Sequence, residues 1–392
     1  MRLGYFDYEL PDDRIAQSPR PRGTSRLLVV DRAAGAWKEG TIRDLPRLLR
    51  RGDLMVANDT RVFPARLLGR RDPSGGAVEC LLLEPFSRSP GGQLVGIRPT
   101  VSRSSPVLHD VDVRTALERV RDTEWLALVH PGHKLKVGVR MVFEDPSRAP
   151  GVAIRAEVLE RLYFGRRRLR LTVDSGPESG AGIDRAIDAL GHIPLPPYIR
   201  RPDSPDDRER YQTIFARARG SVAAPTAGLH FDQEVLESLQ AAGIDWTTLT
   251  LHVGYGTFKP VRTEDVTQHQ VDAERFEIPA ATADAIERAR AAGRRVVAVG
   301  TTTTRALEGP AGENGVPVAG RGATELFIRP GHRFRVVDAM LTNFHLPRSS
   351  LFVLVCAFAG RDLMLAAYRD AIARGFLFYS YGDAMLIGDD LN

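Results

Sequence analysis

The stretch that decides the fold runs from Thr282 to Arg305 and reads TADAIERARAAGRRVVAVGTTTTR. Apolar residues recur at helical spacing as far as Ala289, and Gly293 stands where a helix-terminating glycine belongs. The uninterrupted apolar run from Val296 to Val299 that follows is typical of a strand buried on both faces of a parallel sheet. The stretch therefore predicts a helix, a turn and a central strand.

The same alternation of helix and strand continues on either side. Upstream, Asp232 is suited to cap a helix that ends near Gly243, and a strand with alternating apolar residues follows from Thr248 to Val253. Downstream, Leu363 to Arg374 has the spacing of an amphipathic helix. This alternation predicts an α/β sheet with crossover helices, and we expect a large, barrel-like α/β domain.

A different pattern occupies residues 67–182. The apolar runs there are short, alternate with period two and are separated by Gly, Pro and Asp, as in a small antiparallel β-barrel. Only Arg114 to Arg121 has helical periodicity. Because α/β-type strands also precede the segment, at Leu27 to Val30 and Leu54 to Val56, we expect it to be an insertion. The predicted domains are a discontinuous α/β catalytic domain, residues 1–66 and 183–392, and an inserted β-barrel domain, residues 67–182.

The composition excludes several classes of protein. Of 392 residues, 43% are hydrophobic and 26% charged, and no apolar run approaches the roughly 20 residues of a membrane span. The two cysteines, Cys80 and Cys356, are far apart, so neither a disulfide framework nor a thiolate zinc site is expected. Acidic residues close to Met1 do not fit a secretory signal, and we expect a cytoplasmic protein. The net charge of +5 permits nucleic-acid binding but does not require it.

Three loops beside predicted strands or helices combine glycine, hydroxyl and imidazole groups. Gly300 to Arg305 follows the central strand, and glycine with free amides at a helix start favours a carboxylate or phosphate. His252 to Pro260 follows another strand, and in the small-residue loop Ala223 to Asp232 the carboxylate of Asp232 is near enough in sequence to hold His230 in one tautomer. Each loop also has a structural interpretation, as a turn or a helix cap. Strand-end loops are nevertheless where open α/β sheets bind ligands.

Further polar groups come from Asn58 to Arg61, Asn343 to Pro347 and Tyr379 to Asp383. No HExxH motif, Cys/His metal spacing, GxGxxG or Walker loop occurs in the sequence. Neither a metal nor a dinucleotide is therefore predicted.

Together these segments resemble one family, the S-adenosylmethionine:tRNA ribosyltransferase-isomerases of queuosine biosynthesis. The similarity spans nearly the whole chain, and its motifs come in the family's order. Those that carry it include Tyr8 to Pro11, Asn58 to Leu67, Gly191 to Ile199, Arg210 to Ala216, Pro225 to Phe231, His252 to Val261, Gly300 to Glu308, Thr342 to Pro347 and Tyr381 to Ile387. The stretch from Phe86 to Glu124 is longer than is usual for the family.

The resemblance implies that S-adenosylmethionine donates its ribosyl group, which is transferred and rearranged onto 7-aminomethyl-7-deazaguanine at the wobble position of a tRNA anticodon. Epoxyqueuosine-tRNA forms, adenine and methionine leave, and no metal or further cofactor takes part. The sulfonium acidifies the adjacent 5′ carbon, so a base whose pKa lies near the working pH can remove a proton there.

The roles that follow from this resemblance fall on named residues. His230 or His252 is expected to transfer the proton, with Lys259 and Asp383 acting on amine or sugar oxygens. The expected substrate-binding residues are Asp59, Arg61, Pro225, Thr226, Ala227, Gly228, Gly254, Gly256, Thr257, Phe258, Gly300, Thr301, Thr302, Thr303, Arg305, Asn343, Phe344, His345 and Tyr381.

RNA recognition is expected to stack a splayed base on aromatic rings and to place phosphates on arginines. The candidates are Arg166, Arg167, Arg168, Tyr198, Arg200, Arg201 and Tyr211. We expect tRNA and S-adenosylmethionine as partners, no membrane, and a monomer or a weak homo-oligomer.

Two other functions stay open from the sequence alone. One is an S-adenosylmethionine-dependent RNA methyltransferase, against which the missing glycine-rich turn after the first strand argues. The other is a noncatalytic tRNA-binding module, which requires all of the Gly, Thr and His loops to be structural. Release of free adenine, of S-adenosylhomocysteine or of neither distinguishes the three.

Overall fold

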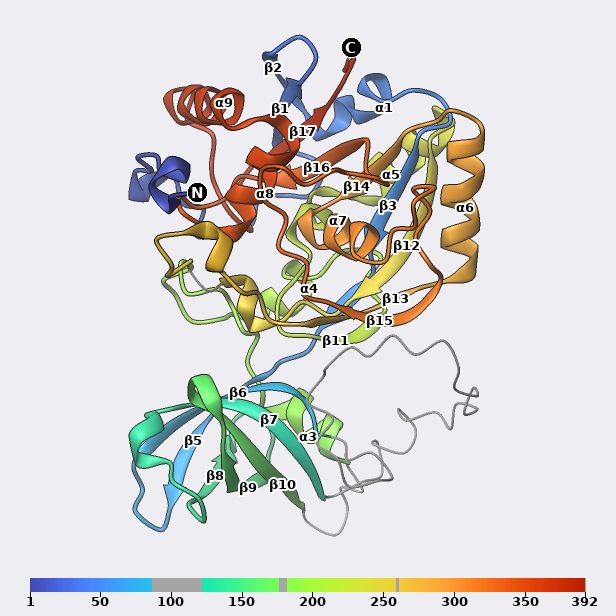
Figure 1. The fold of residues 1–392 in the computed structure, drawn as a ribbon. Helices are drawn as coiled ribbons and strands as arrows, with labels where there is room; N and C mark the ends of the chain where they lie inside the picture. Colours follow the sequence, from blue (N-terminus) through green and yellow to red (C-terminus); the bar gives the residue numbers. More distant parts are fainter. Residues whose placement is uncertain (87–121, 176–181, 259–260, 392) are drawn as a thin grey trace. The chain divides into compact units, whose positions relative to one another are not determined.

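The computed structural model describes residues 1–86, 122–175, 182–258 and 261–391 (Figure 1). The chain divides into two compact units, Met1–Arg61 with Leu195–Asn392, and Val62–Pro194. The second unit extends further at both ends than the 67–182 segment expected from the sequence. The helix predicted from Arg114 to Arg121 lies outside the described residues.

The larger unit is built on a nine-stranded sheet with the order β15-β13-β12-β3-β14-β16-β17-β1-β2. Strands β12, β3, β14 and β16 are parallel, while β17 and β1 run the opposite way. The strands are β1 (Arg26–Asp31), β2 (Ala36–Thr41), β3 (Leu54–Asn58), β12 (Asp245–Leu251), β13 (Glu274–Ile278), β14 (Val296–Val299), β15 (Gly320–Thr324), β16 (Ala339–Asn343) and β17 (Ala384–Gly388).

The predicted α/β class is confirmed, and the run from Val296 to Val299 is a central parallel strand, as expected. The sheet is open, however, and not barrel-like. A barrel requires its two edge strands to pair with each other, whereas β15 and β2 stand at opposite ends of the strand order.

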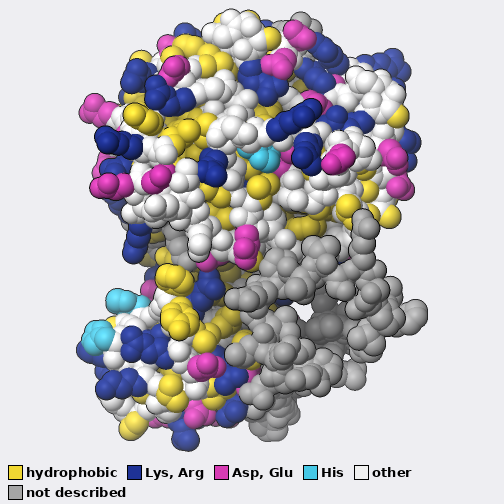
Figure 2. Space-filling view, viewed as in Figure 1, with side chains coloured by type: hydrophobic (Ala, Val, Ile, Leu, Met, Phe, Trp, Pro, Cys, Tyr) yellow, Lys and Arg dark blue, Asp and Glu magenta, His cyan; other side chains and the backbone are white. Residues whose placement is uncertain are grey.

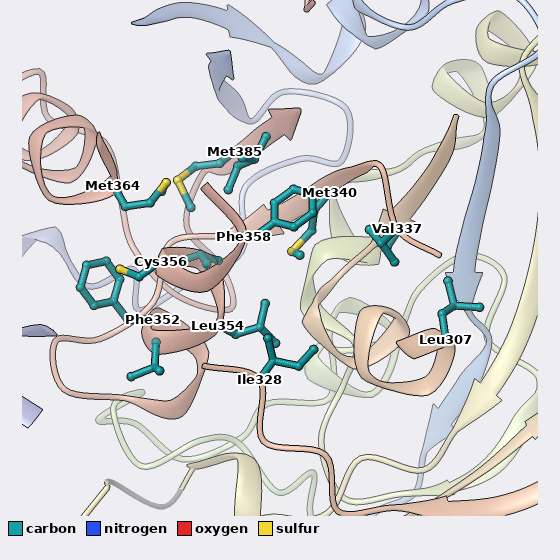
Figure 3. Packing of buried hydrophobic residues seen from close by; sticks show 14 of the residues in the cluster. Leu307, Ile328, Val337, Met340, Phe352, Leu354, Cys356, Phe358, Met364 and Met385 are labelled. Atoms are coloured by element: carbon teal, nitrogen blue, oxygen red, sulfur yellow. The ribbon is translucent and has the colours of Figure 1, made fainter. Parts of the chain in front are cut away.

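Helices cover both faces of this sheet because its central strands are apolar on both sides. In β14, Val297 and Val299 belong to one buried cluster with residues of α1 and α5, while Val296 and Ala298 belong to the other cluster, with residues of α6, α7, α8 and α9. Figure 3 shows α8 directing Phe352, Leu354, Cys356 and Phe358 into this second cluster. The helices are α1 (Leu45–Leu48), α4 (Asp207–Arg210), α5 (Gln233–Ala241), α6 (Ala280–Ala291), α7 (Thr301–Glu308), α8 (Ser350–Ala359) and α9 (Arg361–Ala373).

The smaller unit contains a closed antiparallel barrel of six strands in the order β10-β7-β6-β5-β8-β9, which confirms the predicted β-barrel. Alternation is regular in its strands; in β9, for example, Ile154, Ala156 and Val158 are buried. Its elements are β5 (Arg66–Asp72), β6 (Ala77–Pro85), β7 (Asp122–His130), β8 (Arg140–Glu144), β9 (Val152–Arg161), β10 (Arg166–Ser175) and helix α3 (Ile183–Leu190). Two further short strands of the chain are β4 (Thr60–Val62) and β11 (Ala218–Ser221).

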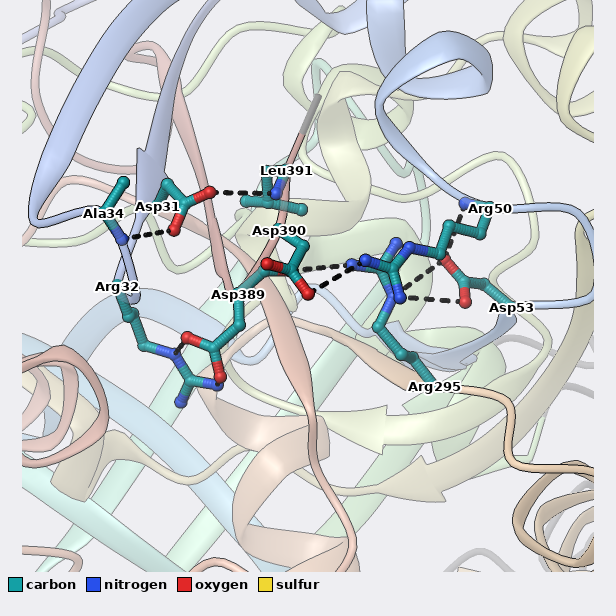
Figure 4. Close-up of polar contacts among 9 residues, drawn as sticks. All are labelled: Asp31, Arg32, Ala34, Arg50, Asp53, Arg295, Asp389, Asp390 and Leu391. Atoms are coloured by element: carbon teal, nitrogen blue, oxygen red, sulfur yellow. Dashed lines mark hydrogen bonds and ion pairs between the residues drawn. The ribbon is translucent and has the colours of Figure 1, made fainter.

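Ion pairs join neighbouring segments at the edge where the central strands of the large sheet begin. Asp53, directly before β3, lies 2.6 Å from Arg295, directly before β14 (Figure 4). At the end of β17, Asp389 lies 2.7 Å from Arg32. This leaves the opposite ends of β3 and β14 to the loops that the sequence singles out.

On the face seen in Figure 2, Lys and Arg side chains lie on both units with Asp and Glu among them. No single helix within the described ranges has the length and hydropathy of a membrane span, although α8 and α9 meet the criteria as a pair that bends by 115°.

Candidate active site

One edge of the large sheet collects the polar loops. The parallel strands β3, β12, β14 and β16 end at this edge. Strands β17 and β1 run the opposite way and therefore begin there, as the pairing of Ala384 with both Asn343 and Leu27 requires. Segments from early, middle and late parts of the chain consequently meet at this edge, which is where ligands bind in α/β sheets.

A cavity of about 220 Å³ opens at this edge beside the first turn of α7. Five of the loops singled out from the sequence and one predicted RNA contact contribute to its wall. The predicted residues that line it are Tyr198, Pro225, Thr226, Ala227, Gly300, Thr301, Thr302, Asn343, Phe344 and His345.

The hydroxyl of Tyr379 in the cavity wall has no hydrogen-bond partner among the described residues, and the same holds for two buried side chains there, at Oδ1 of Asn343 and Oγ1 of Thr302. Asn343 and Thr302 have exposed fractions of 2% and 7%. An unsatisfied buried polar atom costs about 1–3 kcal/mol. Such atoms in a cavity wall indicate a ligand that supplies the missing hydrogen bonds.

The hydrogen bonds of Asn343 fix the direction of its amide. Its Nδ2 donates to the carbonyl oxygen of Tyr379 and to Nε2 of His230, both at 3.0 Å, so Oδ1 remains for a ligand. Because Nε2 accepts, the imidazole proton of His230 is on Nδ1, which lies 2.7 Å from Oγ of Ser25. Burial lowers the pKa of His230 to about 4, so the ring is neutral at neutral pH.

The tautomer of His230 is therefore set by Asn343 and Ser25. Of the two interpretations of Asp232 that the sequence left open, the structure shows the helix cap. Asp232 caps α5, where its carboxylate accepts a hydrogen bond from the backbone N–H of Val235 at 2.8 Å. The aspartate favours this position because the first N–H groups of a helix lack partners within the helix.

His252, the other predicted proton-transfer residue, directly follows β12. Its Nδ1 lies 3.0 Å from Oγ1 of Thr60, whose hydroxyl is also 2.7 Å from Oγ of Ser221. The ring is half-buried, and the next residue, Val253, lines the cavity. Gly220 passes so close that a Cβ there would lie 2.7 Å from ring atoms, so packing also holds the imidazole.

The carboxylates of Asp59 and Asp383 have internal partners. Asp59 accepts a hydrogen bond from Nε of Arg217 at 2.6 Å. Asp383 accepts from the backbone N–H of Leu377 at 2.8 Å and pairs with Arg20 at 2.9 Å, and burial raises the pKa of its carboxyl group. These contacts indicate that both residues organise loops at the sheet edge.

Two predicted substrate contacts within α7, Thr303 and Arg305, also have internal partners. Oγ1 of Thr303 donates to the carbonyl oxygen of Val299 at 2.7 Å, and Arg305 forms a buried ion pair with Glu274. Lys259 lies outside the described residues. The remaining predicted contacts that do not line the 220 Å³ cavity are Asp59, Arg61, Gly228, Gly254, Gly256, Thr257, Phe258 and Tyr381.

The RNA candidate Arg201 and the predicted substrate contact Tyr381 share one partner. Both donate to the carboxylate of Asp207, Arg201 at 2.7 and 2.9 Å and Tyr381 at 2.8 Å. Burial would raise the pKa of Asp207, but these bonds lower it below its ordinary value. Tyr211 is fully buried and offers no ring face to a base, whereas Arg200 is 67% exposed.

In the barrel, the arginine cluster is divided between surface and interior. Arg167 is only 2% exposed and donates to the carbonyl oxygens of Leu135 and Gly132. Arg168 lies 3.5 Å from Glu124 and is 15% exposed, and Arg166 is half-buried. The expectation that Arg167 binds phosphate was wrong, because a cationic run in a strand alternates between the two faces of the sheet.

Several lining residues escaped the prediction. Tyr379 and Ser380 line the cavity beside Tyr198, whose hydroxyl lies 2.5 Å from Oγ of Ser380. Ser25 reaches His230 from just before β1. The sequence singles out the polar segment Tyr379 to Asp383, but it does not show that this segment and Ser25 meet at one edge, because that depends on the reversed direction of β17 and β1.

The fold and the cavity define an α/β protein with a small-molecule site at the ends of its strands. Among the described residues, no group of three or more His, Cys, Asp or Glu side chains is arranged to hold a metal ion. The chain belongs to the family described as queuosine biosynthesis protein, whose model matches residues 3–387.

Relatives of known name match over nearly their full length. S-adenosylmethionine:tRNA ribosyltransferase-isomerase of Solibacter usitatus is 48% identical, over 99% of this chain and all of the relative. The proteins of the same name from an Anaeromyxobacter species and from Desulfitobacterium hafniense are 48% and 44% identical over 99% of this chain. The crystal structure of S-adenosylmethionine tRNA ribosyltransferase from Thermotoga maritima is 32% identical, with a TM-score of 0.49 over 98% of this chain and 99% of that chain.

Proposed function

We propose that this protein is an S-adenosylmethionine:tRNA ribosyltransferase-isomerase, an enzyme that transfers and isomerises the ribosyl group of S-adenosylmethionine onto a tRNA base. The observation that carries the proposal is the match to relatives of that name over 99% of this chain and 100% of the first relative. The cavity beside α7 provides the place for the chemistry.

S-adenosylmethionine would bind in this cavity. Its apolar wall, with Ala223, Ala227 and Val253, suits a nucleoside, and the free Oδ1 of Asn343 accepts from an amino or hydroxyl group. The first backbone amides of α7, at Thr301 and Thr302, point their partial positive charge toward a carboxylate.

Proton transfer is assigned to His252. Removal of a proton from the 5′ carbon beside the sulfonium requires a basic nitrogen within reach. His230 is a poor candidate because it is enclosed, has a pKa of about 4 and already accepts a hydrogen bond at Nε2 from Asn343. We assign His230 the task of orienting Asn343. We propose that Lys259 acts at amine or sugar oxygens, whereas the predicted role of Asp383 there is less favoured because its buried carboxylate is bonded to Leu377 and Arg20.

The second substrate would be a tRNA anticodon loop with 7-aminomethyl-7-deazaguanine at the wobble position. Its conversion to epoxyqueuosine releases adenine and methionine, so S-adenosylmethionine is consumed as a substrate. Tyr198, in the cavity wall, and the exposed Arg200 are the proposed RNA contacts. We further propose that the enzyme is cytoplasmic and acts as a monomer or a weak homo-oligomer.

The test is product analysis with S-adenosylmethionine and an anticodon stem-loop that carries the precursor base. We expect free adenine; S-adenosylhomocysteine would indicate a methyltransferase, and neither product a binding module. His252→Ala should slow single-turnover adenine release about a hundredfold or more. His230→Ala should mainly weaken S-adenosylmethionine binding. Equal rates for His252→Ala and the parent enzyme would remove the assignment of His252.

A further inference from the structure

A second, smaller pocket of the larger unit is rich in arginine. Arg20, Arg22 and Arg210 line it together with Ser25, His230 and Ser380, and its lining includes no Asp or Glu. The arginines come from two distant parts of the sequence, the segment before β1 and helix α4. None of the three was predicted as a binding residue from the sequence.

Two of these arginines form no ion pair among the described residues. Arg20 pairs with Asp383 at 2.9 Å, but neither Arg22 nor Arg210 has an ion-pair partner in the described part of the chain. Burial, together with the neighbouring charge of Arg210, lowers the pKa of Arg22, although the charge of Asp232 acts in the opposite direction. The fold therefore holds like charges close together in a half-buried place, which is unfavourable unless an anion joins them.

The guanidinium groups are held in place by backbone oxygens. Arg22 donates to the carbonyl oxygens of Gln212 at 2.6 Å, Glu209 at 2.9 Å and Leu229 at 3.3 Å. Arg210 donates to the carbonyl oxygen of Arg20. Carbonyl oxygens fix the direction of a guanidinium without neutralising it, so both groups are preorganised to bind an oxyanion.

We propose that this pocket binds a phosphate of the RNA substrate, an inference that rests on the proposed function. Ser380 lines both this pocket and the large cavity. His230 belongs to the pocket and bonds to Asn343 in the cavity wall. An oxyanion here is thus a neighbour of the S-adenosylmethionine site, as a backbone phosphate beside the reacting base has to be.

The other source of an oxyanion is the methionine carboxylate of S-adenosylmethionine. The start of α7, in the cavity itself, already offers backbone amides to that group at Thr301 and Thr302. Neither Thr301 nor Thr302 belongs to the lining of the arginine pocket. Phosphate is therefore the ligand that the two sites together favour.

The experiment compares Arg210→Gln, Arg210→Lys and the matched control Arg47→Gln, whose side chain is 81% exposed. The control loses the same charge from the same unit. Binding of an anticodon stem-loop RNA is measured by fluorescence anisotropy from low to high salt, and binding of S-adenosylmethionine by calorimetry, which also reports folding.

We expect Arg210→Gln to weaken RNA binding about tenfold, as for loss of a charge-assisted hydrogen bond. The slope of log K against log salt concentration should become less negative by about 0.7, because each phosphate contact on a single strand contributes about that much to the slope. S-adenosylmethionine binding should stay within about twofold of the parent, and Arg210→Lys should recover most of the RNA affinity.

RNA binding equal to that of Arg47→Gln would overturn the proposal. So would weaker binding of S-adenosylmethionine with RNA binding intact, which would assign the pocket to the carboxylate. Adenine release by the parent enzyme is measured in parallel. If the parent enzyme released no adenine, the proposed reaction would be rejected. The RNA-binding measurements would still decide whether the pocket binds phosphate.

Discussion

Thr302 and Thr303 are adjacent and chemically identical, but their hydroxyl groups have different surroundings. Oγ1 of Thr303 donates to the carbonyl oxygen of Val299, so it completes the first turn of α7. Oγ1 of Thr302 has no partner among the described residues and lies in the cavity wall. A substrate that fills the cavity should therefore bond to Thr302 and not to Thr303.

Valine at each position tests this at the scale of one hydroxyl group. Thr302→Val should weaken S-adenosylmethionine binding about fivefold, because one neutral hydrogen bond contributes about 1 kcal/mol. Thr303→Val should leave that affinity unchanged and lower the melting temperature. Calorimetric titration and thermal unfolding of both variants provide the two readings. Equal affinities in the two variants would contradict the assignment of the free hydroxyl to the substrate.

At the scale of the element, a buried ion pair joins the starts of β3 and β14. Asp53 is 2% exposed and Arg295 13% exposed, at 2.6 Å (Figure 4). Asp53→Asn removes this charge and should lower the free energy of unfolding by about 3 kcal/mol, because Arg295 keeps a poorly solvated charge without its partner. Urea unfolding monitored by circular dichroism measures the change.

Asp390→Asn is the matched control. It breaks the ion pair between Asp390 and Arg50, which has the same chemistry. The charged atoms of this pair lie 3.1 Å apart, and the side chains of Arg50 and Asp390 are 50% and 71% exposed. Exposed pairs contribute less than about 1 kcal/mol, so this variant should differ little from the parent. A loss as large as that of Asp53→Asn would show that burial is not what gives the inner pair its weight.

The elements themselves were largely predictable because their signals are local. The helix before the central strand, the strand and the barrel's alternating strands all follow from side-chain periodicity. The start of α6 was less predictable, because the helix begins at Ala280, two positions before the predicted Thr282. The hydroxyl of Thr282 does not cap it but donates to the carbonyl oxygen of Thr248 at 2.7 Å, a tertiary contact that sequence spacing cannot reveal.

At the scale of the whole molecule, the site depends on strand direction. The loops at Gly300 and Asn343 follow strands, so their convergence was predictable. Ser25 and Ser380 precede strands, and they reach the same edge only because β1 and β17 run against their neighbours. Periodicity identifies a strand without giving its direction, so the meeting of Ser25 and Ser380 at this edge, and the pocket with Arg22 and Arg210, were not predictable, although the segment that contains Ser380 was noted in the sequence.

The stability of the whole larger unit should depend on pH through two buried histidines. Burial lowers the pKa of His230 to about 4 and that of His345 to about 3, below the ordinary value of 6.5. As pH falls below 6.5, the unfolded chain therefore binds protons that the folded chain does not. Stability is full above pH 6.5, decreases as pH falls toward the folded pKa values and then levels off, with each histidine contributing at most about 1.4 kcal/mol per pH unit.

His230→Gln removes one of these two groups, so its unfolding free energy should change less between pH 7 and pH 5 than that of the parent, even where its absolute stability is lower. His133→Gln, an exposed substitution in the smaller unit, serves as the control. Urea unfolding at pH 7, 6 and 5 gives the three slopes. A slope in His230→Gln as steep as in the parent would mean that His230 is protonated in the folded state, and its assigned role of accepting a hydrogen bond from Asn343 would then be lost.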